Sequence, residues 1–400
     1  MIKKAILASL IVFGLLIWLA ASVSAFSGAE ITQAVTYVFG EELTFTLSCP
    51  TSEQLEQAWL FIRPDGMGIA NFNIELDGSD EYRFEITPTQ LLLKPFSTVT
   101  YWYELEFENG TEVVTDEVSF DYIDNRVDWQ HTANGQFDLY WQTGNHDFGA
   151  AALNIAQQAW ENLASIYDSL PATPILVYLY PNSADLQEAL ALGEMNWVAG
   201  HADPELNVVL TSVSPGPEQR LEMQRQIPHE LAHLFAYASL QDGYAQQPRW
   251  LLEGLASMAE ATQNEMYTQA LAEAVNTNQL MALEDLCTDF PVNGPEVYLA
   301  YAQSLSFTSY LQNEYGFVQL RELMDAYSEG LTCNAGFQRT YNMSLTQAQA
   351  DWQQAVFGTR GITMVWQALS PILLLLVLLG LLPLAITLIR KHKAEKSGHE

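Results

Sequence analysis

Hydrophobic and polar residues alternate along several short runs in the first third of the chain. The clearest runs are 43–47 and 100–108, and an Asn-Gly pair at 109–110 separates the second from another such run at 111–120. Alternation with a period of two indicates strands with one buried face, and Asn-Gly between two such runs favours a hairpin. Several short strands in this stretch predict a β-sandwich-like domain over residues 26–127. We find no constellation of catalytic side chains in it.

The pattern changes near residue 128, where apolar runs begin to alternate with stretches of helical periodicity. We expect strands at 137–141, 174–180 and 207–211, a helix at about 148–169, and mostly helices from 217 to about 357. A small sheet followed by helices predicts an α+β domain over residues 128–358.

Two longer apolar runs mark the ends of the chain. At the N-terminus, two lysines precede an apolar run at 5–21 and a small-residue pattern at 23–25. This order is typical of a secretory signal peptide over residues 1–25, with an uncleaved anchor as the alternative. At the C-terminus, residues 365–389 are almost wholly apolar and long enough to cross a hydrocarbon core of ~30 Å. The tail at 390–400 is basic, so the positive-inside rule predicts a cytoplasmic C-terminus.

These two runs predict a single-pass protein of the cell membrane whose body lies outside the cytoplasm. The formal net charge is −32, and six of the 16 basic residues lie at the two ends, so the body is more acidic than the whole chain. Such a surface excludes nucleic acid as a partner, because binding requires clustered Lys and Arg. Two interpretations of the acidic surface stay open: a preference for cationic substrates, or a solvated coat that favours solubility.

Three cysteines are present, and none has the spacing of a zinc site. An exported chain can form disulfides. Cys287 and Cys333 lie in the same predicted domain and are the expected pair, which leaves Cys49 over.

The segment His229–His233 reads His-Glu-Leu-Ala-His within a helical pattern. Residues four apart share a helix face, so both imidazoles can reach one ion. Zinc accepts neutral histidine nitrogens, and a catalytic site needs three protein ligands and one open position for water. Glu230, beside the first histidine, is then placed to take a proton from that water.

A second segment lies downstream and reads Trp-Leu-Leu-Glu-Gly-Leu-Ala at 250–256, with Glu253 twenty residues after His233. Together the two segments resemble the gluzincin metallopeptidases, a group that includes thermolysin, the leukotriene-hydrolase type of aminopeptidase and the peptidase MA-like domains. The likeness covers roughly residues 130–357. It implies a thermolysin- or aminopeptidase-like zinc domain, peptide or protein substrates, and Glu253 as the third zinc ligand.

The same resemblance suggests two further site residues. Glu260, seven residues after Glu253, matches a glutamate that supports a zinc ligand in the aminopeptidase-like relatives. Tyr301 matches the frame of a tyrosine that donates to the developing oxyanion, with Tyr298 one turn earlier as the second choice. For both tyrosines a packed core side chain remains the alternative, and for Glu260 a solvated helix end.

No segment of the G-x-M-E-N type, which recognises a free amine in aminopeptidases, is present; the nearest equivalent is 200–203. We therefore favour an endopeptidase. The strand at 207–211 is expected to form the edge of the cleft, and His201 is expected to lie in a loop, most simply without a role. Polar residues close to the motif exclude an intramembrane protease.

The predicted function is hydrolysis of peptide bonds by zinc-activated water, with Glu230 as general base. The alternative is a catalytically silent, peptidase-like binding or adhesion protein, which the loss of a ligand or of Glu230 would favour. A purely structural zinc site is disfavoured because such sites usually have four protein ligands, and no fourth is evident nearby.

Overall fold

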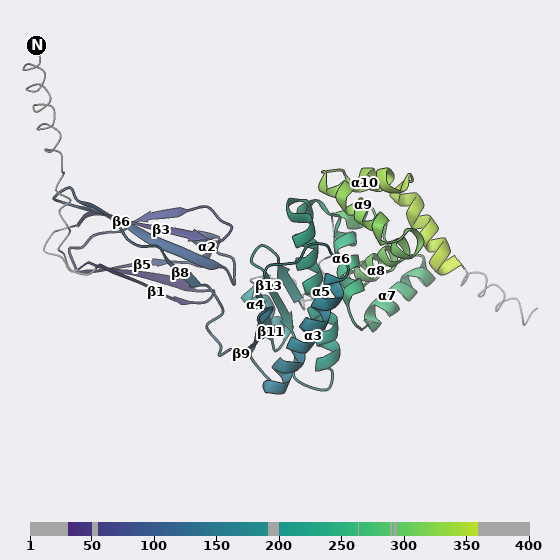
Figure 1. Cartoon of the computed structure of the whole chain (residues 1–400), viewed down its shortest axis with the longest axis horizontal. Coiled ribbons are helices and arrows are strands. Elements are labelled where there is room, and N and C mark those ends of the chain that lie inside the picture. The colour runs from purple at the N-terminus through teal and green to yellow at the C-terminus, as the bar shows by residue number, and fades with distance from the viewer. Residues whose placement is uncertain are drawn as a thin grey trace, which may run out of the picture. The chain divides into compact units, whose positions relative to one another are not determined.

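In the computed structural model, the described residues are 31–49, 55–190, 200–262, 264–288, 290–291 and 294–358. They fall into two compact units, one ending at Arg126 and the other beginning at Val127 (Figure 1). The predicted signal peptide and the predicted membrane span at 365–389 lie outside the described residues. Within the part that is described, no helix combines the length and apolarity that crossing a membrane requires.

The first unit is built from antiparallel strands in two sheets. One sheet has the order β1-β2-β5; the other has the order β4-β3-β6-β7, with β8 also paired to β6. Aromatic rings close the space between the sheets, for example Phe45 of β2 and Tyr101 of β6, whose ring centroids lie 5.0 Å apart. The strands are β1 (Thr32–Val38), β2 (Glu42–Ser48), β3 (Leu55–Pro64), β4 (Ala70–Asn73), β5 (Glu81–Ile86), β6 (Thr98–Phe107), β7 (Glu112–Val114) and β8 (Val118–Asp121).

The predicted run at 111–120 is not one strand. Thr115 lies between β7 and β8, and its hydroxyl accepts a hydrogen bond from the backbone N–H of Tyr103 at 2.9 Å. The two short strands then pair with different parts of β6. The Asn-Gly turn is present, and Gly110 has a φ of +79°, a left-handed conformation that glycine adopts without strain.

The second unit begins with a five-stranded mixed sheet of order β12-β13-β11-β10-β9. The three central strands are parallel, and the outer two run antiparallel to their neighbours. Their bounds are β9 (Gln130–Ala133), β10 (Phe137–Trp141), β11 (Ile175–Tyr180), β12 (Gly200–Asp203) and β13 (Val208–Ser212). The expectation that 207–211 is the edge strand was therefore wrong: among the described strands β12 is the outer one, and His201 lies in it rather than in a loop.

Helices follow the sheet and form the larger part of the second unit (Figure 1). Asn145 begins the first long helix by accepting a hydrogen bond from the Phe148 backbone N–H at 3.1 Å. The main helices are α3 (His146–Ala164), α5 (Gln219–Leu240), α6 (Arg249–Ala259), α7 (Glu265–Thr277), α8 (Glu296–Tyr315), α9 (Phe317–Ser328), α10 (Cys333–Tyr341) and a last one at 345–358. Shorter elements are α2 (Pro88–Leu91) in the first unit, α4 (Ser183–Ala189), and the 3₁₀ turns η1 (Gln241–Gln246) and η2 (Asp285–Cys287).

Close helix packing explains the glycine of the second motif. A Cβ added at Gly254 of α6 would overlap Thr308 and the Ser304 carbonyl of α8. Next to this contact, the Trp250 and Phe307 rings lie 5.0 Å apart between the same two helices. The absence of a side chain therefore lets α6 lie flat on α8.

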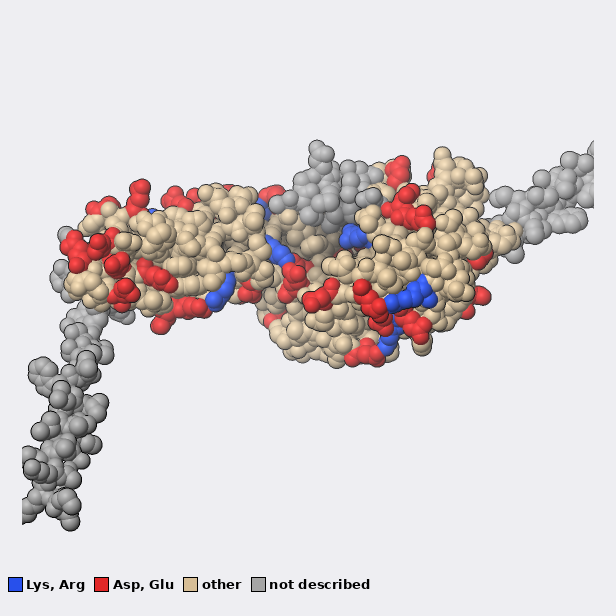
Figure 2. Space-filling model, turned by 90° about the horizontal axis from the view of Figure 1, so that it is seen from above, with Lys and Arg blue, Asp and Glu red and all other residues tan. Residues whose placement is uncertain are grey.

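The cysteines follow the predicted pairing. Cys287 and Cys333 are joined by a disulfide, which ties η2 to the start of α10. Cys49 is a buried free thiol in the first unit. On the face seen in Figure 2, Asp and Glu are scattered over both units and Lys and Arg appear at few points, as the composition leads one to expect.

Candidate metal centre

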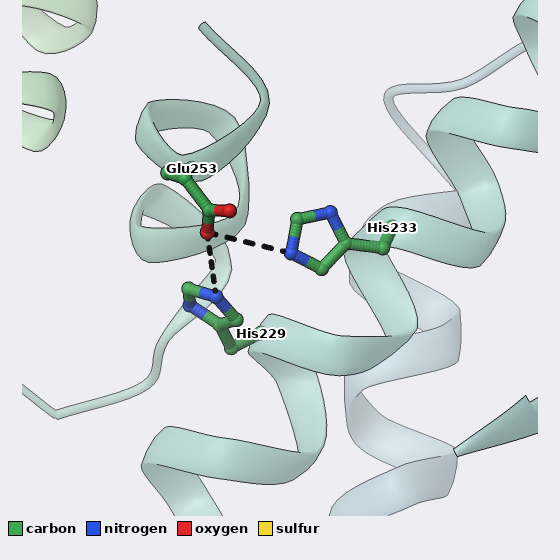
Figure 3. Close-up of side chains that lie close together, drawn as sticks. All are labelled: His229, His233 and Glu253. Atoms are coloured by element: carbon green, nitrogen blue, oxygen red, sulfur yellow. Dashed lines mark ion pairs between the residues drawn. The ribbon is translucent and has the colours of Figure 1, made fainter. Parts of the chain in front are cut away.

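Two histidines and one glutamate converge between α5 and α6 (Figure 3). The Nε2 atoms of His229 and His233 lie 3.4 and 3.6 Å from the same carboxylate oxygen, Oε2 of Glu253. One turn of α5 separates the two histidines, so both rings leave the same face of the helix. Ligand-type atoms of all three residues lie within 4.8 Å of one another.

The spacing of these atoms fits a zinc ion. Bonds of ~2.0–2.1 Å in a tetrahedral shell place neighbouring ligand atoms ~3.3 Å apart. The two histidine-to-glutamate distances are close to that value, so only a small adjustment separates the present geometry from a zinc shell. Two imidazole nitrogens and one carboxylate oxygen are also the donor types that catalytic zinc sites use. The residues present therefore fit the ion that the sequence predicts.

The cluster is buried, and burying an ionised carboxylate is unfavourable unless a positive charge lies beside it. His229 and Glu253 have only 9% and 5% of their surface exposed. Desolvation is the largest single effect and opposes ionisation of both, but several partners together outweigh it. Hydrogen bonds to Glu253 and Glu260 help to raise the pKa of His229 well above its ordinary value, and hydrogen bonds to both histidines help to lower the pKa of Glu253. The site thus favours an ionised carboxylate and positive charge beside it, which a divalent cation supplies.

Glu230 lies next to the cluster but is not part of it. It lines a pocket together with His229, Glu260 and Tyr301, which come from three different parts of the chain. Burial raises the pKa of Glu230, although the two histidines oppose this effect. A buried carboxylate with a raised pKa, facing a pocket, can both accept and deliver a proton.

The edge strand β12 is packed directly against this carboxylate. Gly200 lines the same pocket, and a Cβ added there would overlap the Glu230 carboxylate. Glycine at position 200 therefore lets the backbone of β12 approach Glu230 more closely than any other residue would. This role was not evident from the sequence, because nothing near residue 200 shows that its partner lies thirty residues later.

We expect Gly200→Ala to lower activity by about ten- to a hundredfold without loss of metal, because the added methyl displaces Glu230 and small misplacements of a reacting group cost that much. Turnover of a peptide substrate, measured with the zinc content of the same sample, tests this. Gly68→Ala is the control, since a Cβ at Gly68 meets nothing within 4 Å. Unchanged turnover in Gly200→Ala would contradict the conclusion that the close approach of β12 at Gly200 positions the Glu230 carboxylate.

Glu260 lies just beyond the end of α6, where it contacts His229. Its Oε1 is 3.0 Å from His229 Nδ1, so the carboxylate can accept a hydrogen bond from the Nδ1–H and leave Nε2 to face Glu253. On a continuous helix the seven-residue spacing would put Glu260 on the same face as Glu253, but α6 ends at Ala259 and the backbone leaves the helix at Glu260.

A proline inside α5 explains how this turn is held. Pro228 has no backbone N–H, so the carbonyl of Gln224, four residues earlier, is left without its usual helical donor. The backbone N–H of Ala261 donates to that carbonyl at 2.9 Å instead. This bond joins the residue after Glu260 to α5, one turn before His229. The proline in the motif helix thus creates the docking point for the glutamate that orients the first histidine.

Tyr244 of η1 contacts the second histidine. Its hydroxyl lies 3.2 Å from His233 Nδ1, the nitrogen on the side of the ring away from Glu253. Each histidine therefore has one nitrogen toward Glu253 and the other held by an oxygen. No motif in the sequence marks Tyr244, and only its position in the short connection between the two motif helices hints at such a role.

We expect Tyr244→Phe to weaken zinc binding by about tenfold, the lower end of the usual cost of losing such a partner. The phenyl ring keeps the packing and removes only the hydroxyl, so thermal stability in the presence of a chelator is expected to change little. Competition with a chromogenic chelator measures the affinity. Tyr237→Phe on α5 is a matched control, because its ring packs on Tyr244 at 5.6 Å. Equal affinities in wild type and Tyr244→Phe would remove this role.

Tyr301 lies close to the cluster. Its ring centroid is 6.0 Å from that of His229, and it stacks on Tyr267 of α7 at 5.8 Å. Burial raises the pKa of Tyr301 well above its ordinary value, so the hydroxyl keeps its proton and can act as a donor. Tyr298, the second choice, lines the same pocket but is 36% exposed.

Solved structures give only weak likenesses. One is a family 56 carbohydrate-binding module that binds β-1,3-glucan, with 16% identity, coverage of 23% of this chain and 99% of that chain, and a TM-score of 0.18. Another is a polysaccharide deacetylase from Bacillus cereus, with 8% identity, coverage of 50% and 66%, and a TM-score of 0.22. Scores this low carry no conclusion about function. The search of curated proteins found no match.

The family comparison is informative. The model of the peptidase MA superfamily matches residues 155–358, which is half of the chain and contains every residue of the cluster and pocket described above. This agrees with the resemblance that the two motifs indicate in the sequence. The chain therefore belongs to the peptidase MA superfamily.

Proposed function

We propose that this chain is a membrane-anchored, extracytoplasmic zinc metallopeptidase that hydrolyses peptide bonds in peptides or proteins. The observation that carries the proposal is the convergence of His229, His233 and Glu253 on one point beside Glu230, within a peptidase MA domain. The three residues would hold zinc. When bound, zinc would act as a Lewis acid that polarises a carbonyl and makes water nucleophilic near neutral pH.

The residues around the metal cluster have the remaining catalytic and positioning roles. Glu230 takes the proton of the attacking water and delivers it to the leaving amine, which its raised pKa favours. Tyr301 donates to the oxyanion as charge develops there. Glu260 and Tyr244 keep the two histidine rings oriented. No covalent intermediate with the protein is needed.

The extracytoplasmic location rests on separate observations. The disulfide between Cys287 and Cys333 supports an oxidising compartment, since cytosolic proteins rarely keep such bonds. Anchoring through residues 365–389 and export through residues 1–25 follow from the sequence pattern alone. Labelling of a C-terminal tag in intact and permeabilised cells tests the topology: accessibility only after permeabilisation supports it.

The enzymatic proposal is tested with the purified full-length chain and a mixed peptide library. We expect one equivalent of bound zinc and cleavage that stops when a chelator removes the metal and returns when zinc is restored. Internal cleavage sites would assign an endopeptidase, and stepwise loss of terminal residues an exopeptidase. Stoichiometric zinc without cleavage of any peptide would reject the proposal in favour of a binding protein.

A further inference from the structure

The pocket beside the metal cluster contains one guanidinium group. Of the described residues that line it, Arg225 is the only Lys or Arg, while Glu230 and Glu260 are acidic. Much of the remaining wall is uncharged, including Asn264 and Tyr267. Arg225 therefore places a positive charge in the wall of this pocket, in a chain with few basic residues.

Arg225 is placed by the same helix that carries the first histidine. It precedes His229 by one turn of α5, so the two side chains leave the same face. Its side chain is 26% exposed, partly buried but open to the pocket. Its charge is near enough to Tyr267 to lower the pKa of that hydroxyl against the larger effect of burial.

A chain of hydrogen bonds holds the guanidinium group of Arg225 in place. Arg225 pairs with Glu222, and the same Glu222 oxygen accepts a bond from Gln226 Nε2 at 3.0 Å. Gln226 is in turn bonded in both directions to the backbone of Ser212 in β13, at 3.2 and 3.0 Å. The guanidinium is therefore held relative to the sheet and the metal cluster, which reduces the entropy lost when it binds a ligand.

The Arg225 guanidinium has more N–H donors than its contact with Glu222 uses. It carries five N–H groups in a planar fork, and within the described part of the chain its one hydrogen-bonded acceptor is Glu222, reached through Nη2. A fork of this kind matches a carboxylate, to which it can donate two parallel bonds. An anionic group entering the pocket would meet repulsion from Glu230 and Glu260 unless Arg225 balanced it.

We propose that Arg225 is a specificity-determining residue that binds a carboxylate of the substrate, from an acidic side chain or from the C-terminal end of the peptide, in the pocket beside the metal cluster. This inference rests on the proposed peptidase function and adds the substrate class. This preference for a carboxylate acts at close range within the pocket. The acidic surface of the protein repels a substrate carboxylate only through solvent, where salt largely screens the interaction beyond ~8 Å. The acidic surface therefore does not prevent selection of an acidic group at close range.

The experiment compares matched peptides with the zinc-loaded full-length chain. In one series a single Glu/Gln exchange moves through the positions on both sides of the cleaved bond; in the other the C-terminus is free or amidated. The first series detects an acidic side chain and the second a terminal carboxylate. Affinity is measured by calorimetry with the Glu230→Gln background, and kcat and KM with active enzyme. We expect the carboxylate form to be favoured about tenfold in one series, mainly through KM.

Substitution of the arginine gives the decisive comparison. In Arg225→Gln the ratio between carboxylate and amide forms is expected to fall to about one, and Arg225→Lys is expected to restore part of it. Arg220→Gln on the same helix is the control, because Arg220 is exposed and does not line the pocket. General damage to α5 would lower binding of both peptides equally and would leave the ratio unchanged.

The outcomes separate this proposal from the one on which it rests. Cleavage of peptides without preference for the carboxylate form, or a preference that survives in Arg225→Gln, would overturn the role of Arg225 alone. A preference for cationic peptides would also overturn it. Failure of the zinc-loaded chain to cleave any peptide would overturn the proposed function, and the role of Arg225 in substrate selection with it.

Discussion

Glu230→Gln is expected to lower kcat for peptide hydrolysis by about 10²–10⁴-fold, the usual contribution of a positioned general base. Glutamine keeps the size of the side chain and its place against Gly200, but it cannot accept the water's proton. Zinc content is expected to stay unchanged, because Glu230 is not among the three residues whose ligand atoms converge. The loss should therefore fall on kcat, with little change in substrate affinity.

The measurement is steady-state hydrolysis of one identified peptide, with metal determined on the same protein. Glu218→Gln is the matched control: it is an exposed glutamate at the start of α5 that does not line the pocket. A reduction of less than about tenfold would show that another group takes the proton and would end the assignment of Glu230 as base.

Local patterns predicted the second unit well because its elements are long or strongly apolar. β10 was predicted at its observed bounds, 137–141, and β11 and β13 within a residue or so. The edge was misassigned because β12 is only four residues long, at 200–203, and carries no alternating signal. Strand order depends on contacts between distant segments, and no local pattern specifies these.

In the site, too, some residues could be found from local sequence patterns and others depend on tertiary contacts. Spacing brought His229 and His233 into consideration, since four residues make about one helical turn, and the resemblance of the second motif to the gluzincins added Glu253. The groups that orient them are different in kind. Tyr244 acts from a 3₁₀ turn, and the contact of Glu260 depends on Pro228 freeing a carbonyl of α5 for Ala261. Such roles arise from tertiary contacts, and no periodic pattern in the sequence marks the residues that have them.

Zinc is expected to stabilise the second unit, and Glu253→Ala to abolish that effect. At a free zinc concentration a thousand times the dissociation constant, binding adds ~4 kcal/mol to the free energy of unfolding. For a unit of this size each kcal/mol raises Tm by ~2–4 °C, so zinc should raise Tm of the wild type by about 10 °C over the chelated protein. Without Glu253 one of three ligands is lost, and the shift should nearly vanish.

The chelated proteins should also differ. Glu253 is 5% exposed and faces both histidines, so its removal leaves two largely buried imidazoles without their shared acceptor, at a cost of ~1–3 kcal/mol. Thermal unfolding in zinc and in chelator, followed for wild type, Glu253→Ala and the control Glu273→Ala, separates the two effects. Glu273 is an exposed glutamate within α7, outside the cluster. If Glu253→Ala gains as much from zinc as the wild type does, the third ligand lies elsewhere, and the convergence at Glu253 reflects an ion pair between charged side chains rather than a metal site.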